Sequence, residues 1–210
     1  MTTLRAYHNQ QSIKDTYITR VQAHRAADEL IKGVYRDDEY AGVWRGCAVG
    51  CTLHSSDHDR YEIELGIPRQ LALLEDAIFE GLPEPKHLEW PERFLASIPV
   101  GADLRAVHHQ FTVWLLLDEQ HGVIRFLETD EERALMRRIA NLHERSIEGD
   151  RPSEDEWAAA WDAAWDAARD AAWDAARAAA RAAARDAHYV VMSDKLIEFL
   201  QAAPLLVPAE

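Results

Sequence analysis

The sequence lacks the features that define several large classes of protein. Its 210 residues contain only two cysteines, Cys47 and Cys51, which excludes the disulfide framework of small secreted domains. No apolar run approaches the ~20 residues that a membrane-spanning helix needs. The first residues, from Met1 on, contain no apolar segment of a secretory signal. We therefore expect a cytoplasmic protein without a membrane segment.

Basic residues are also in the minority. The chain has 23 Lys and Arg against 37 Asp and Glu, a formal net charge of -14. Such a field repels phosphate backbones and anionic membrane surfaces on average, so nonspecific nucleic-acid binding is not expected. A local basic patch could still bind one small anion. With 48% hydrophobic residues, the chain has globular composition, and its length fits a single domain over residues 1–210.

Glycine and proline are few, and several of them mark the ends of helical patterns. Apolar residues recur at helical spacing from Ser12 to Lys32, and Gly33 follows as a stop. Further helices are predicted after Pro68 up to Gly81, from Trp90 to before Pro99, after Asp103, and over 129–147 from a capping box at Thr129 and Glu132. The predicted fold is therefore mainly α, a multi-helix bundle with a small irregular or β-hairpin insert near 34–58.

A four-residue repeat dominates the region from Trp157 to Asp186, written almost entirely in Ala, Trp, Asp and Arg. Alanine is the strongest helix former, and a second capping box at Ser153 and Glu156 precedes the repeat. We predict one long alanine-rich helix over 151–203, attached to a helical core over 1–150. Each four-residue step turns the helix by about 400°, so the repeat cannot form a straight heptad coiled coil.

The second half of this helix carries arginine where the first half carries tryptophan. Arg177, Arg181 and Arg185 form a ridge, with Trp173 nearby, that could grip a nucleotide-like anion by charge-assisted hydrogen bonds and stacking. Two other interpretations stay open. The tryptophan end could pack on the core, which we favour, or the alanine grooves could mediate self-association into a homo-oligomer.

The strongest candidate for chemistry is a short loop that contains both cysteines. The spacing Cys-x3-Cys-x2-His-x3-His joins Cys47, Cys51, His54 and His58. Zinc prefers thiolate and imidazole ligands, so these four side chains could close a tetrahedral site. The spacing differs from that of common zinc fingers. Alternatively, the cysteines are small buried residues, or one of them is a thiol nucleophile activated by His54.

Two adjacent histidines, His108 and His109, lie at the start of the helix predicted after Asp103. Paired imidazoles could serve a metal ion or an acid–base step. We favour the plainer interpretation, in which one histidine is packed and the other is solvated.

The residues around the loop also carry a resemblance. The chain is similar to a family of uncharacterised bacterial and phage proteins over Gly46–His58, Tyr61–Glu62, Leu65–Pro68, Leu74–Pro83, Ile98–Leu104 and an Ala/Trp-rich C-terminal tract that ends in a segment like Met192–Leu196. The resemblance covers most of the chain. It implies no activity and no catalytic residues, but the phage members favour a role around infection or host defence.

These observations lead to three hypotheses about function. We expect a non-enzymatic helical binding protein that sequesters a small anionic ligand or docks a protein partner. The alternatives are an enzyme that depends on a metal ion or thiol at Cys47–His58, with zinc as the implied ion, and a self-associating structural protein.

Overall fold

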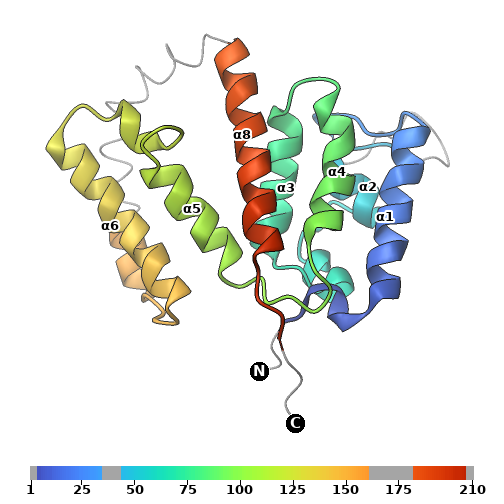
Figure 1. Cartoon of the computed structure of the whole chain (residues 1–210), viewed down its shortest axis with the longest axis horizontal. Coiled ribbons are helices and arrows are strands. Elements are labelled where there is room, and N and C mark those ends of the chain that lie inside the picture. Colours follow the sequence, from blue (N-terminus) through green and yellow to red (C-terminus); the bar gives the residue numbers. More distant parts are fainter. Residues whose placement is uncertain (1–3, 35–43, 161–181, 207–210) are drawn as a thin grey trace. The chain divides into compact units, whose positions relative to one another are not determined.

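The computed structural model describes residues 4–34, 44–160 and 182–206, with side chains from 186 onward in the last segment (Figure 1). This part of the chain is mainly helical, as the sequence pattern predicts, and the C-terminal helix is present. Its elements are η1 (Ala6–Asn9), α1 (Gln11–Ala26), α2 (Ala48–Leu53), η2 (Tyr61–Leu65), α3 (Arg69–Gly81), α4 (Lys86–Ser97), α5 (Val107–Leu117), η3 (Val123–Phe126), α6 (Asp130–Ile147) and α8 (Ala182–Gln201). Residues 154–160 are also helical.

The chain divides into two compact units, which we describe separately. Unit 1 comprises Met1–Val107 and Met192–Glu210, and unit 2 comprises His108–Val191. The single domain predicted over residues 1–210, with a helical core over 1–150 and a long helix over 151–203, stays a prediction. Helix α8 starts in unit 2 and ends in unit 1.

Unit 1 is built on α1, α3 and α4, with α1 and α4 side by side (Figure 1). The apolar stripe of α3 buries Ile78 and Phe79, and α4 buries Trp90 and Phe94. Removing a large apolar side chain from water contributes about 1.5–3 kcal/mol. These side chains therefore supply much of the stability of the unit.

A tight approach between the chain start and η2 explains Gly66. This residue has φ +64, and a Cβ there would lie 2.1 Å from the carbonyl oxygen of Arg5. Only glycine fits that backbone without a shift. The neighbouring Tyr7, His8 and Asn9 also have positive φ, so η1 is a left-handed turn that the sequence pattern did not predict.

Two helix boundaries differ from the prediction. Helix α1 ends at Ala26 instead of Lys32, because Asp28 adopts φ +55 and the chain then pairs Leu30 with Gly46. Helix α4 begins at Lys86 and contains Pro91 in its interior. A proline removes only one intrahelical hydrogen bond donor, and the packing of its neighbour Trp90 holds the helix together.

Both predicted capping boxes of unit 2 are confirmed. Thr129 and Glu132 cap α6 reciprocally, and Ser153 and Glu156 do the same for the helix over 154–160. Between them, Gly149 has φ +88, and the amides of Gly149 and Asp150 donate to the carbonyls of Ser146 and Arg145. This is a Schellman motif, which turns the chain sharply after α6.

The insert near 34–58 contains the short helix α2, and residues 35–43 lie outside the described part. Within the described ranges the chain forms isolated β-bridges and no strand. Most of the four-residue repeat, 161–181, also lies outside the description. None of the helices among the described residues has the length and apolar character that a membrane crossing requires.

Candidate metal centre

Three histidines of unit 2 converge at one point. His108 and His109 come from the first turn of α5, and His143 comes from the last turns of α6. One ring nitrogen of each lies within 4.8 Å of the others. The closest pair is Nδ1 of His109 and Nδ1 of His143, 2.8 Å apart. In the described residues, this is the group of three or more His, Cys, Asp or Glu side chains that could hold a metal ion.

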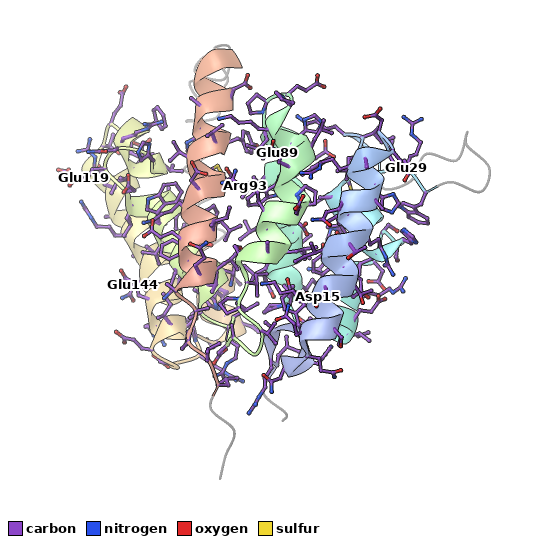
Figure 2. The ribbon with its side chains drawn as sticks, turned by 45° about the vertical axis from the view of Figure 1, so that its right-hand side comes forward. Asp15, Glu29, Glu89, Arg93, Glu119 and Glu144 are labelled. Atoms are coloured by element: carbon purple, nitrogen blue, oxygen red, sulfur yellow. The ribbon has the colours of Figure 1, made fainter. Side chains whose placement is uncertain are left out.

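Local structure explains how His143 reaches this point. The capping box at Thr129 sets the start of α6, and His143 lies four residues after Ile139, on the face predicted to point inward. In Figure 2 the labelled Glu144 marks the neighbouring position on α6. The ring of Trp157 meets His143 edge-on, with centroids 4.9 Å apart.

An ion pair fixes the position of Trp157. Arg145 bridges Asp150 at 2.6 Å and Glu156 at 2.5 Å, so the end of α6 is tied to the start of the next helix. Trp157 follows Glu156 directly. The Schellman turn and this ion pair therefore help to place the Trp157 ring against His143.

The cluster keeps its imidazoles uncharged near neutral pH. Burial, followed by the repulsion of His109 and His143, lowers the pKa of His108 to about 3. Burial and the neighbouring His109 lower the pKa of His143 to about 4. Burial also lowers the pKa of His109. Neutral imidazole is the form that binds metal ions, so the rings need lose no net proton at pH 7. The proton shared between Nδ1 of His109 and Nδ1 of His143 has to move to an Nε2 atom before both Nδ1 atoms can bind a metal.

The dimensions of the cluster suit a metal ion after small side-chain rotations. Zinc binds histidine nitrogen at about 2.0–2.1 Å, which places two nitrogens of a tetrahedral site roughly 3.3 Å apart. The nitrogens of His109 and His143 are 2.8 Å apart and would separate slightly. The other pairs lie within 4.8 Å, so at most about 1.5 Å separates them from that spacing.

The two cysteines predicted as zinc ligands make hydrogen bonds with the backbone around α2. Cys47 precedes this helix, and its Sγ accepts the amide of Gly50 at 3.5 Å. The Cys51 thiol donates to the carbonyl of Gly46 at 3.4 Å. Both cysteines are buried. Burial and the hydrogen bond to Asp76 raise the pKa of the Cys47 thiol well above its ordinary value, and burial raises the pKa of Cys51 to about 12.

The two predicted histidine ligands face different neighbours. His54 ends α2 with φ +54, and its Nε2 lies 2.8 Å from Nε2 of His24. Glu29 approaches Nδ1 of His24 at 2.6 Å from just beyond the end of α1, where Figure 2 labels it. His58 Nε2 lies 4.0 Å from the carboxylate of Asp76.

The loop therefore divides between two polar clusters. Cys47 and His58 both approach Asp76, whereas His54 joins His24 and Glu29. The four-ligand zinc site stays a prediction. Of the predicted anion-binding ridge, Trp173, Arg177 and Arg181 lie outside the described residues, and Arg185 is described only as part of the α8 backbone.

Sequence reasoning found two members of the histidine cluster and missed the third. No local pattern links His143 to His109, because 34 residues separate them in the chain. One signal was present, since His143 continues the inward face of Ile139 on a helix that was itself predicted. The approach of α5 and α6 that brings the histidines together is a tertiary feature.

No protein-family model, curated protein or solved structure matches this chain.

Proposed function

We propose that this protein is a helical binding protein that holds one divalent transition-metal ion of the zinc class. The observation that carries the proposal is the convergence of His108, His109 and His143 within 4.8 Å. Imidazole suits zinc, copper, iron and nickel, whereas magnesium, calcium and manganese prefer oxygen ligands. A group made only of imidazoles therefore favours the first set of metals.

The thiol chemistry that the sequence suggested has less support. A cysteine nucleophile acts as the thiolate. Cys47 is 1% exposed and its pKa is raised, so at neutral pH it stays a buried thiol. A small anionic ligand on Arg177, Arg181 and Arg185, a protein partner and a role in phage infection or defence remain expectations from the sequence.

Calorimetric titration with Zn²⁺ at pH 7 tests the proposal. We expect one ion per chain. His109→Gln and His143→Gln should each weaken binding by more than about 100-fold, because even outer-shell partners of a metal site are worth about 10–100-fold. His188→Gln is the matched control, since it removes a unit 2 imidazole outside the cluster. Circular dichroism of the metal-free variants checks that the helices are retained.

Two results would contradict the proposal. The first is a wild-type chain that takes up no zinc. The second is a zinc affinity that survives His109→Gln and His143→Gln unchanged. A Cys47→Ser, Cys51→Ser double variant shows which of the two predicted centres is occupied, because zinc lost only in this variant would place the ion in the Cys47–His58 loop.

A further inference from the structure

The cluster provides three ligands, and zinc in proteins commonly takes four. No fourth His, Cys, Asp or Glu joins His108, His109 and His143 in the part of the chain that the structure describes. Structural zinc sites are closed by four protein ligands, whereas sites that act on other molecules keep one position for water or a ligand. The donor count at this cluster matches the second kind of site.

The charge of the cluster points to the kind of ligand. Its three donors are imidazoles, which bind a metal ion in their neutral form and so add no negative charge to it. A divalent ion held by neutral donors keeps its full charge of about +2 in a partly buried place, where the field is screened less than in water. A small anion would neutralise part of that charge. Thiolate or carboxylate ligands would themselves neutralise part of the metal ion's charge, so such a site would attract an added anion less strongly.

The surroundings limit the size of such a ligand. His108, His109 and Trp157 are each partly exposed, which leaves a path to the solvent. At the same time, the Trp157 ring contacts the His143 ring in a T-shaped arrangement, with centroids 4.9 Å apart. This combination suits a compact anion with one donor atom.

We infer that the ion held by His108, His109 and His143 binds a small monovalent anion, such as a simple carboxylate, at a coordination position that the described residues leave open. The inference rests on the proposed metal site. It also gives the acidic chain a way to bind an anion without its arginine ridge.

Cobalt substitution tests the inference. Co²⁺ accepts the same nitrogen ligands, and its visible absorption depends on coordination number and geometry. The Co²⁺-loaded protein is titrated separately with acetate and with azide at constant ionic strength. We expect saturable changes in the band position and intensity for both anions. His188→Gln should show the same changes.

The outcomes separate this inference from the proposed function. If Co²⁺ binds at the histidine cluster but neither anion changes its spectrum, the coordination shell is closed and only the inference fails. If Co²⁺ does not bind, or binds equally well to His109→Gln and His143→Gln, the proposed metal site fails and the inference fails with it. A response that persists in the Arg177→Ala, Arg181→Ala, Arg185→Ala variant supports anion binding at the metal.

Discussion

Each unit of the protein contains a histidine cluster, and the two clusters differ in one component. In unit 1, His24 and His54 meet through their Nε2 atoms at 2.8 Å, and Glu29 lies 2.6 Å from Nδ1 of His24. In unit 2, Nδ1 of His109 and Nδ1 of His143 meet at the same distance, and the third member is His108. One cluster ends in a carboxylate, and the other ends in a third imidazole.

The presence or absence of a carboxylate decides whether a cluster suits a proton or a metal ion. A carboxylate only accepts hydrogen bonds, so a proton on Nδ1 of His24 satisfies Glu29, and the contact between the two Nε2 atoms needs one further proton. The unit 2 cluster has three neutral rings and no carboxylate among its members, so a metal ion can satisfy several lone pairs at once. On the proposed function, similar contacts between imidazoles therefore suit different chemistry.

The largest expected effect is the stabilisation of unit 2 by zinc. A ligand at 100 times its Kd raises the free energy of unfolding by about 2.7 kcal/mol if it binds only the folded state. Thermal melting with and without Zn²⁺ should show this gain in the wild type and in His24→Gln. The gain should vanish in His143→Gln. An equal loss in His24→Gln would show that the two clusters do not differ as described.

Acid should destabilise the metal-free unit 2. The pKa of an unfolded histidine is about 6.5, whereas His108 and His143 have pKa values of about 3 and about 4 in the folded chain. Above pH 6.5, His108 and His143 are neutral in both the folded and the unfolded chain, so their protonation does not reduce the free energy of unfolding. As the pH falls from 6.5 towards 4 and 3, the unfolded chain binds protons that the folded chain does not, so stability is lost.

Urea unfolding of the metal-free protein at a series of pH values measures this slope. A His108→Gln, His143→Gln double variant should show a shallower loss of stability between pH 6.5 and pH 4. The prediction is wrong if the wild type and this variant lose stability in parallel, since other groups would then carry the acid sensitivity.

A smaller effect is expected when the unit 1 cluster loses its carboxylate. Glu29→Gln removes the charged acceptor from His24, which is 8% exposed. An unsatisfied buried donor costs about 1–3 kcal/mol, and the glutamine oxygen recovers part of that cost. We expect urea unfolding to show a loss of about 1 kcal/mol at pH 7. Zinc affinity should stay within twofold of the wild type, and a larger change would link Glu29 to the metal.

Local rules predicted a large part of the helical structure. Capping boxes such as Ser153 with Glu156 depend only on residues a few positions apart, and both were found where predicted. The boundaries of α3 also follow from Pro68 and Gly81. The end of α1 was wrong because Leu30 pairs with Gly46, a contact between distant residues that overrides the helical periodicity.

The candidate site shows more clearly which features depend on local sequence and which depend on contacts between distant residues. Residue type alone singled out Cys47, His54 and the pair His108 and His109 as chemically capable. Burial and hydrogen bonding then decided what each does, because they set protonation state and contacts. Cys47 became a buried thiol, and His54 became the partner of His24.

The amino-acid sequence by itself determined that this protein is mainly helical, acidic and provided with imidazole and thiol side chains. These properties come from composition and from interactions within one or two helical turns. Only the tertiary structure decided which imidazoles meet, because the packing of α5 and α6 joins residues 34 positions apart. It also decided their charge, since the pKa of a histidine depends on its burial and its neighbours in space.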